Sequence, residues 1–279
     1  WMKQYVKKSY GKKGDAVVNM NYAAIDKAAS ELKEIKVPAD WADATTGAEP
    51  AKLADDKYFR EVIHPIIALQ GDKLPSSAFN ADGSVPTGTT KFEKRGVAVK
   101  IPQWNAENCI QCNQCSFVCP HACIRPVLVK DGEEVPATFA TKAAIGLKGY
   151  SYRMQVSPLD CMGCGVCANI CPTKEDKKAL TMIPLEKAVK EETVNYDFSE
   201  KLPEVDTSVF KKNTVKGSQF SKPLFEFSGA CAGCGETPYI KVITQMFGDR
   251  MIIANATGCS SIYGGSSPTC PYTKNAEGK

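Results

Sequence analysis

The spacing of apolar residues predicts a helix near the start of the chain and a shorter one after it. Residues 21–35 carry apolar side chains on one helical face, with Asn21 as the predicted N-cap. That face consists of Ala24, Ala28, Leu32 and Ile35. A second helical pattern, at 56–63, is expected to end near Pro65, because proline has no N–H with which to continue the helix. The segment that follows is rich in turn residues.

Short apolar runs predict strands farther along the chain. The predicted strands are residues 97–101, 125–129, 152–157, 224–228 and 250–256. The last two flank a predicted helix at 237–247, with Thr237 as its N-cap and Pro238 at its first position. Its apolar face consists of Ile240, Ile243, Met246 and Phe247. This order of elements is that of a βαβ unit, in which the two strands are parallel.

Composition places the chain among ordinary globular proteins, apart from its cysteines. Of 279 residues, 43% are hydrophobic and 24% are charged, and the net charge of +4 is too small and too evenly spread to indicate nucleic-acid binding. No apolar run approaches the roughly 18 residues of a membrane span, and the basic start lacks the apolar core of a secretory signal. We therefore expect a soluble, cytoplasmic protein whose 13 cysteines mainly bind metal and do not form disulfides.

Two cysteine motifs, at residues 109–120 and 161–172, share the spacing C-x2-C-x2-C-x3-C-P. This spacing turns three thiolates toward one point, as an iron-sulfur cluster requires, and in two-cluster ferredoxins the fourth cysteine of each motif binds the other cluster. The predicted ligands are Cys109, Cys112, Cys115 and Cys171 for a first [4Fe-4S] cluster, and Cys161, Cys164, Cys167 and Cys119 for a second. The alternative, a pair of zinc ribbons, leaves the third and fourth cysteines of each motif without a use. With their flanking strands, residues 87–205 are expected to form a ferredoxin-like domain of βαββαβ type, with an insertion between the motifs.

A third group of cysteines follows in the predicted βαβ unit. Cys231 and Cys234 come after its first strand and Cys259 after its second, and loops at the carboxyl ends of parallel strands meet on one sheet edge. From the spacing alone, these three cysteines and Cys270 are candidates for a zinc site. Glu236 lies just before the helix, where an acidic side chain interacts favourably with the helix dipole.

Three further residues are interpreted as structural. Cys123 lies outside both ligand sets and is expected to be a packed thiol. His121 is expected to be a hydrogen-bonding residue rather than a ligand, and His64 precedes a proline without a visible partner.

Over most of its length the chain resembles the single-chain pyruvate:ferredoxin (flavodoxin) oxidoreductases. The resemblance is carried by "LQGDKLP", "GTTKFEKRGVAVKIPQWNAENCIQCNQCSFVCPHACIRP", "LDCMGCGVCANICP", "GACAGCGETPY" and "ATGCSSIYGGSSPTCPYT". The cysteine motifs alone would be generic, whereas "CAGCGETPY" together with "TGCSSIYGG" is specific to that family. The order of the segments is also that of the family.

The resemblance implies an enzyme that decarboxylates pyruvate with thiamin diphosphate and Mg²⁺ and forms acetyl-CoA from coenzyme A. Electrons would pass through three [4Fe-4S] clusters to ferredoxin or flavodoxin, and the parent protein is expected to be a homodimer. In this family the cluster nearest to thiamin is bound by cysteines that match Cys231, Cys234 and Cys259, with a fourth ligand beyond this chain. The Cys270 thiol then becomes incidental.

The resemblance also implies roles for three residues near the cofactors. Glu236 matches the catalytic carboxylate that promotes proton movement on the thiamin aminopyrimidine. Cys259 would line the thiamin pocket as well as bind iron. Asn21 lies where the family contributes an asparagine to coenzyme A, although an N-cap explains Asn21 equally well.

In these terms we expect an α+β multidomain fragment. Its parts are the tail of a coenzyme A-binding α/β domain (1–45), a small connecting domain (46–86), the ferredoxin-like domain (87–205) and the start of a thiamin diphosphate-binding α/β domain (206–279). The family's diphosphate- and magnesium-binding motif and its pyruvate-binding domains do not appear in the sequence, so an internal piece that is inactive alone is expected. A two-cluster electron carrier without thiamin chemistry and a structural zinc protein are the alternatives.

Overall fold

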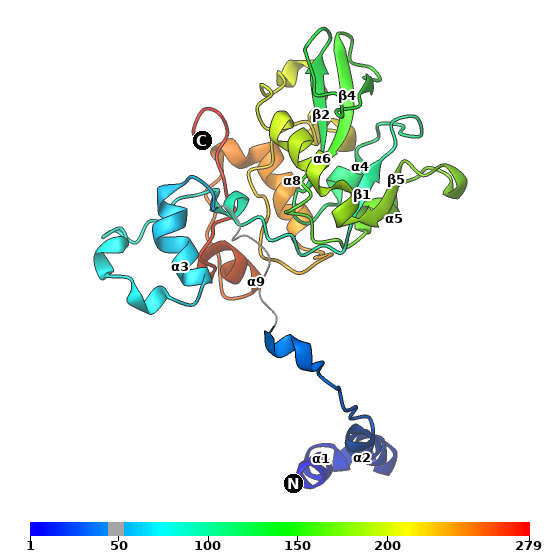
Figure 1. Cartoon of the computed structure of the whole chain (residues 1–279), viewed down its shortest axis with the longest axis vertical. Coiled ribbons are helices and arrows are strands. Elements are labelled where there is room, and N and C mark those ends of the chain that lie inside the picture. The colour runs from blue at the N-terminus through cyan, green and yellow to red at the C-terminus, as the bar shows by residue number, and fades with distance from the viewer. Residues whose placement is uncertain (44–52) are drawn as a thin grey trace. The chain divides into compact units, whose positions relative to one another are not determined.

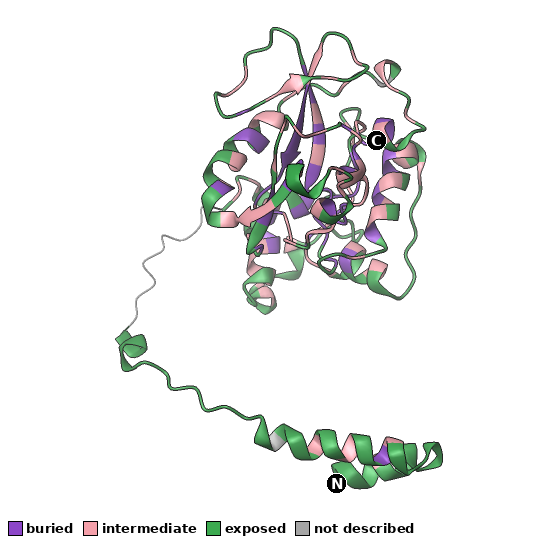
Figure 2. Cartoon of the chain, turned by 90° about the vertical axis from the view of Figure 1, so that its right-hand side faces the viewer, coloured by how far each residue is buried: buried purple, intermediate pink, exposed green. Residues whose placement is uncertain are grey.

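The computed structural model describes residues 1–43 and 53–279, apart from the side chains of Ala29 and Thr207. The chain divides into two compact units, Trp1–Lys52 and Leu53–Lys279 (Figure 1). The first contains α1 (Met2–Tyr10), η1 (Gly11–Lys13), α2 (Asp15–Ser30) and η2 (Ala39–Asp43). Its helices are mostly exposed, whereas the buried residues of the second unit gather around its sheets and helices (Figure 2). The second unit therefore contains the core that positions the cysteine loops.

The position of α2 corrects the prediction for Asn21. The helix begins at Asp15, directly after Gly14, and Asp15 supplies the acidic side chain that a first helical turn favours. Asn21 thus lies in the helix interior, where its side-chain amide donates to the Val17 carbonyl at 2.8 Å, and it is not an N-cap. The helix ends at Ser30, so the predicted apolar face does not extend to Ile35, which is exposed.

The second unit begins with short helical turns. They are η3 (Phe59–Ile63), α3 (His64–Ile67), η4 (Gly71–Lys73), η5 (Ser76–Ala78) and η6 (Thr89–Phe92). The helical path runs on from η3 into α3 and continues two residues past Pro65, so the predicted end near Pro65 comes slightly too early. Phe59, Val62 and Ile63 are the buried residues of η3.

A repeated strand–helix–strand arrangement places the two cysteine motifs. Its elements are β1 (Lys100–Trp104), α4 (Gln114–Phe117), β2 (Ile124–Lys130), β3 (Lys142–Ala143), β4 (Tyr150–Val156), α5 (Val166–Ile170), β5 (Leu180–Pro184) and α6 (Leu185–Ser199). β1 pairs with β5, from Lys100 opposite Pro184 to Trp104 opposite Leu180, and β4 lies between β2 and β3; every pair is antiparallel. The expected insertion is the β2–β4 hairpin with β3. This α+β arrangement is the βαββαβ order that the sequence predicts, with β3 added.

The helix α6 is not among the elements predicted from the sequence. It contacts β1, β4 and β5, and thereby packs against strands of both sheets. Its Tyr196 belongs to the largest buried cluster, with Tyr152 of β4, Leu180 of β5 and Phe227. The helical spacing of Leu185, Ala188 and Val189 was the available signal.

The last part of the chain does not form the predicted βαβ unit. It contains η8 (Thr207–Val209), α7 (Val215–Ser218), α8 (Thr237–Phe247), η9 (Gly248–Arg250), α9 (Cys259–Ser261) and η10 (Ile262–Ser266). The helix at 237–247 is confirmed, although its N-cap is Glu236 and not Thr237. Both predicted strands are wrong in this structure. Residues 224–228 form a single antiparallel bridge, Phe225 with Tyr272, and the left-handed backbone of Phe227 (φ 52°) interrupts an extended path. Residues 250–256 have no strand partner among the described residues.

Among the described residues, no helix combines the length and the apolar character needed to cross a membrane.

Candidate metal centres

The structure brings four cysteines from both motifs around one small pocket. They are Cys109, Cys112 and Cys115 of the first motif and Cys171 of the second. The wall is largely apolar and includes Trp104, Tyr152 and Leu180. Thiolates in such a setting are suited to a soft metal centre that is shielded from water.

The first cysteine loop is fixed by hydrogen bonds from side chains within it. Gln111 and Asn113 have left-handed backbone conformations, with φ of 56° and 60°, which turn the loop tightly around the thiols. Gln111 donates to the Ala143 carbonyl and Asn113 to the Lys216 carbonyl, both at 2.8 Å. Tyr152 donates to the Asn113 amide oxygen at 2.8 Å in the buried core. The positions of the thiols are therefore set by β3, β4 and α7.

A second pocket is surrounded by the other four cysteines of the motifs. They are Cys119 of the first motif and Cys161, Cys164 and Cys167 of the second. Gly163 has a φ of +69°, and a Cβ atom there would lie 3.0 Å from the Lys100 carbonyl oxygen, so this loop requires glycine. The Gly163 N–H points to the Cys161 sulfur at 3.4 Å, just as the Gln111 N–H points to the Cys109 sulfur at 3.4 Å. The repeat thus extends from the sequence to the backbone contacts of the thiols.

Burial keeps several of these thiols protonated in the metal-free chain. Burial raises the pKa of Cys161 to about 12, and it raises the pKa of Cys115 and Cys167 as well. A metal centre binds the deprotonated thiolate, so loading these pockets releases protons.

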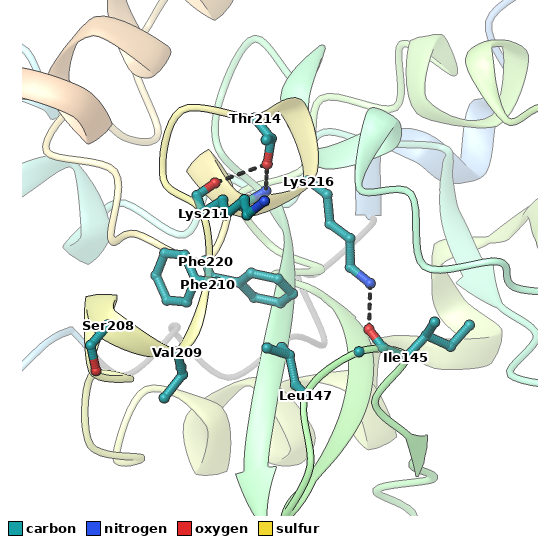
Figure 3. Close-up of a pocket in the computed structure, with 11 residues that line it drawn as sticks. Ile145, Leu147, Ser208, Val209, Phe210, Lys211, Thr214, Lys216 and Phe220 are labelled. Carbon is teal, nitrogen blue, oxygen red and sulfur yellow. Dashed lines mark hydrogen bonds between the residues drawn. The ribbon is translucent and has the colours of Figure 1, made fainter.

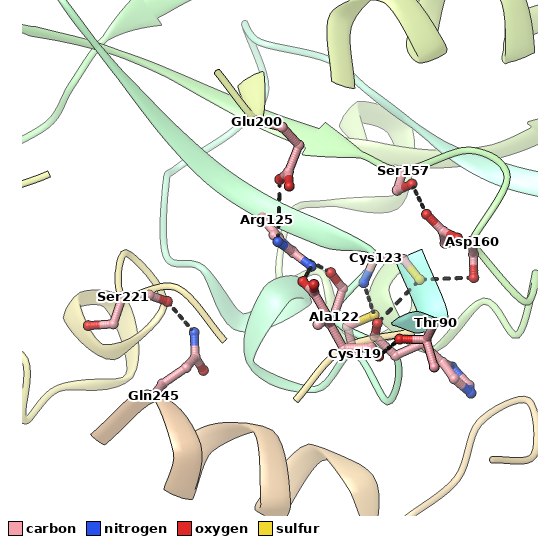
Figure 4. A network of polar contacts seen from close by, with 12 residues as sticks. Thr90, Cys119, Ala122, Cys123, Arg125, Ser157, Asp160, Glu200, Ser221 and Gln245 are labelled. Atoms are coloured by element: carbon pink, nitrogen blue, oxygen red, sulfur yellow. Dashed lines mark hydrogen bonds and ion pairs between the residues drawn. The ribbon is translucent and has the colours of Figure 1, made fainter. Parts of the chain in front are cut away.

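Cys123 and His121 have the structural roles predicted for them. Cys123 is 2% exposed and donates to the Asp160 carbonyl at 3.0 Å, while its N–H points to the Cys119 sulfur at 3.3 Å (Figure 4). It is a packed thiol that lines the second pocket but not the first. The His121 Nε2 lies 2.9 Å from the Ala230 carbonyl oxygen, in a buried hydrogen bond.

The third group of cysteines is more open. Cys231 is exposed, Cys234 is half-buried, and the two share one turn in which the Cys234 N–H donates to the Cys231 carbonyl at 3.0 Å. Cys259 is exposed at the start of α9. Because residues 250–256 do not form a strand, the described residues contain no parallel sheet edge that would place Cys259 next to Cys231 and Cys234.

The zinc interpretation of the third group has no support in the structure. Within residues 1–43 and 53–279, no three His, Cys, Asp or Glu side chains converge as ligands of a single metal ion. The Cys270 thiol points elsewhere and lies 3.7 Å from the Tyr272 carbonyl oxygen. The two cysteine quartets surround pockets instead, an arrangement suited to a cluster in which each thiolate binds a different iron atom.

Glu236 lies beside two buried hydroxyl groups. Its carboxylate is exposed at the N-terminus of α8, and its N–H points to the Cys234 sulfur at 3.5 Å. The Thr237 and Tyr263 hydroxyl oxygens are buried without a hydrogen-bond partner among the described residues. Burial raises the pKa of Tyr263, and the Glu236 carboxylate adds to that effect. An exposed carboxylate beside unpaired hydroxyls is a donor and acceptor set that a polar ligand can use.

The loop with Cys231 and Cys234 lies against the second pocket. Ala230, which accepts the hydrogen bond of His121, directly precedes Cys231. A Cβ atom at Gly233 would stand 3.7 Å from the Cys164 Cβ. Both contacts join the third cysteine group to the quartet that contains Cys119 and Cys164.

Three consecutive charged residues, Glu93, Lys94 and Arg95, connect the start of the second unit with the second cysteine motif and with the part of the chain after residue 227. Lys94 forms an ion pair with Asp160 at 2.5 Å, next to Cys161. Glu93 accepts from the Thr269 hydroxyl at 2.6 Å and also pairs with Arg95, which donates to the Ser228 carbonyl at 3.3 Å. This Glu93-Lys94-Arg95 sequence therefore joins three segments that are distant in the chain.

A larger, open pocket lies near the first quartet but contains no cysteine (Figure 3). Phe210, Phe220 and Leu147 supply apolar walls, and the Lys216 ammonium donates to the Ile145 carbonyl at 2.9 Å. Phe220 also packs edge-on against Tyr152, and together with Val205 it lies against the largest buried cluster.

Models of known protein families match two parts of the chain. Residues 108–175 match the 4Fe-4S dicluster domain, and this range contains the eight cysteines of both motifs. Residues 46–98 match a domain of unknown function named EKR, and this range includes Glu93, Lys94 and Arg95. The chain therefore contains an iron-sulfur domain of dicluster type.

Curated relatives are similar to the chain from end to end. It is 60% identical over 282 residues to a pyruvate:ferredoxin oxidoreductase from Moorella thermoacetica, of which it covers 24%. It is 50% identical over 283 residues to a pyruvate-flavodoxin oxidoreductase from Klebsiella pneumoniae, also covering 24%. A pyruvate-flavodoxin oxidoreductase from Nostoc sp. is 45% identical over 293 residues. The chain is thus homologous to a segment of these oxidoreductases and spans about a quarter of their length.

Proposed function

We propose that this chain is the electron-conducting segment of a thiamin-dependent 2-oxoacid oxidoreductase. The reaction is the oxidative decarboxylation of pyruvate, with coenzyme A as the acetyl acceptor. Electrons leave through three [4Fe-4S] clusters to a ferredoxin or flavodoxin. The parent protein is proposed to be a cytoplasmic homodimer.

The arrangement of the motif cysteines is the observation that carries the proposal. The eight motif cysteines line two pockets in two sets of four, and each set combines three cysteines of one motif with one of the other. This grouping supports the crossed ligand sets, with Cys171 for the first cluster and Cys119 for the second. Iron-sulfur centres exchange single electrons over potentials from about −700 to +450 mV, a range that includes strongly reducing values.

The contacts of the third cysteine group support an order for the relay. The loop that contains Cys231 contacts the region of the second quartet at two places. The Ala230 carbonyl is hydrogen-bonded to His121, and Gly233 lies next to Cys164. Electrons would therefore move from a third cluster at Cys231, Cys234 and Cys259 to the second cluster, and then to the first. A fourth ligand for the third cluster would come from outside this chain.

Glu236 is the proposed catalytic residue at the thiamin end of the relay. Thiamin diphosphate, when bound with its Mg²⁺, supplies the carbanion-stabilising chemistry of decarboxylation. The Glu236 carboxylate would hold the aminopyrimidine by a hydrogen bond and favour its proton transfer, while the unpaired Thr237 and Tyr263 hydroxyls offer further polar contacts. Cys259 would border the same site.

Asn21 stays a predicted contact of coenzyme A. Its amide already donates to Val17 within α2, so its oxygen is the group that a ligand could use.

Pyruvate-dependent reduction of the clusters tests the proposal. The full-length protein that contains this sequence is purified anaerobically, its iron, sulfide and thiamin are quantified, and cluster reduction is followed after addition of pyruvate and coenzyme A. Glu236→Gln should slow this reduction by about 10²- to 10⁴-fold, whereas chemical reduction by dithionite should be unchanged. Glu191→Gln, at an exposed carboxylate of α6, is the matched control and should leave both rates unchanged.

Two other outcomes of this experiment would each point to one of the alternative functions. If dithionite reduces the clusters and pyruvate never does, the chain belongs to an electron carrier or reductase subunit without thiamin chemistry. If zinc replaces iron and no sulfide is present, the chain is a structural zinc protein.

A further inference from the structure

A buried lysine of α8 reaches the segment that joins the two cysteine quartets. Lys241 is 2% exposed. Its ammonium donates to the carbonyl of Ser116 and, at 3.1 Å, to that of Phe117. Both carbonyls lie between Cys115, which lines the first pocket, and Cys119, which lines the second.

The charge of Lys241 has no carboxylate partner among the residues that the structure describes. Buried charges are normally paired or lie beside a metal centre, because their transfer from water is costly. The other nearby cation, Arg125, is paired with Glu226 at 2.5 Å and so leaves Lys241 as the unpaired charge. Burial lowers the pKa of Lys241 to about 8, and the thiolates of Cys119 and Cys115 raise it. The natural counter-charges are therefore the thiolates of the two clusters.

We propose that Lys241 sets the reduction potentials of both clusters, as a fixed positive charge between them. A [4Fe-4S] cluster with four thiolates is an anion and gains a further negative charge on reduction. A buried cation next to it stabilises the reduced form more than the oxidised form, and low solvent exposure leaves that attraction weakly screened. Lys241 thus makes both clusters easier to reduce. It is a positioning residue of the relay, because it touches neither the iron nor the substrate.

If Lys241 had a purely structural role, its loss would affect cluster binding and not the reduction potentials. Three variants at this position distinguish the two roles. Lys241→Gln keeps a donor for the carbonyls of Ser116 and Phe117 but removes the charge. Lys241→Met removes both, and Lys241→Arg keeps the charge. Lys216→Gln is the matched control, because its ammonium also donates to a loop carbonyl near the first quartet but Lys216 is only half-buried.

The midpoint potentials of both clusters are measured by anaerobic redox titration with electron paramagnetic resonance, after iron and sulfide are quantified. In Lys241→Gln and Lys241→Met we expect both potentials to fall by a similar amount. The equilibrium constant for one-electron reduction should fall by about tenfold, which equals about 59 mV. Lys241→Arg should keep both potentials closer to the native values, and Lys216→Gln should change the first cluster by less and the second not at all.

Three results would overturn the inference. One is full iron content with native potentials in Lys241→Gln and Lys241→Met. Another is native potentials in Lys241→Gln with iron loss confined to Lys241→Met, since the lysine would then serve as an anchor. The third is iron loss in both, because the charge would be needed for assembly. The inference rests on the proposed function, and if the native protein holds no pair of clusters, that function fails first.

Discussion

Replacement of Cys171 by serine tests whether the fourth cysteine of each motif belongs to the other cluster. Cys171 lines the pocket of Cys109, Cys112 and Cys115, so Cys171→Ser should damage the cluster at that pocket. A serine hydroxyl is a poor substitute for the soft thiolate that iron-sulfur clusters select. The anaerobically purified protein should then lose about four iron atoms per chain, the content of one [4Fe-4S] cluster.

Double variants identify the affected cluster by counting iron alone. Cys109 and Cys171 line one pocket, so the pair Cys109→Ser and Cys171→Ser should lose no more than either single variant, about four iron atoms. Cys161 lines the other pocket, so Cys161→Ser combined with Cys171→Ser should lose about eight. Inductively coupled plasma analysis together with sulfide determination gives both counts.

Cys123→Ser is the control, because Cys123 is buried and lines the second pocket but belongs to neither predicted quartet. It should retain the full iron content. The crossed assignment is refuted if the pair of Cys109 and Cys171 variants loses about eight iron atoms while the pair of Cys161 and Cys171 variants loses about four. Cys171 would then share a cluster with its own motif.

Two further predictions concern stability, measured by anaerobic urea denaturation. Lys94→Met leaves the buried Asp160 carboxylate with only its bond to Ser157 and should lower the free energy of unfolding by about 3 kcal/mol. Adding Asp160→Asn should restore part of this stability. If the effects of the two substitutions are strictly additive instead, the ion pair is unimportant for stability. Phe225→Ala removes a fully buried ring and should lower the free energy of unfolding by about 3–5 kcal/mol. The Phe247 side chain is half-exposed, so Phe247→Ala should lower it by less than about 1 kcal/mol. Equal losses in the two variants would contradict the core position of Phe225.

The dicluster domain could be predicted from the sequence because its signals are local. A cysteine motif carries its own ligands within a few residues, and the strands on either side show short apolar runs. β2 and β4 lie where these runs predict them, and β1 begins three residues later than expected. The helix at 237–247 was equally clear, because its Pro238 and its apolar face belong to one continuous segment.

The predicted βαβ unit failed because a strand depends on a partner outside its own segment. Residues 224–228 have the apolar residues of a strand, but in the structure their backbone bonds go to two different segments. The Glu226 N–H donates to Pro271 and the Thr273 N–H to Leu224, whereas the Phe227 N–H donates to His121. Residues 250–256 have the same kind of pattern, yet Ile252 is 99% exposed. An apolar run indicates what a segment could pair with, not whether the partner is present.

The same reasoning separates the residues that sequence could assign from those it could not. Cysteine ligands are recognised by residue type and spacing, whatever surrounds them. Lys241 is one lysine in an amphipathic helix, and only the packing of α8 against the loop at Ser116 makes its charge unusual. Lys94 likewise gains its role from Asp160, which lies far away in the sequence. The chemistry of this chain is therefore readable from its motifs, whereas the electrostatic setting that would tune that chemistry comes from contacts between distant segments.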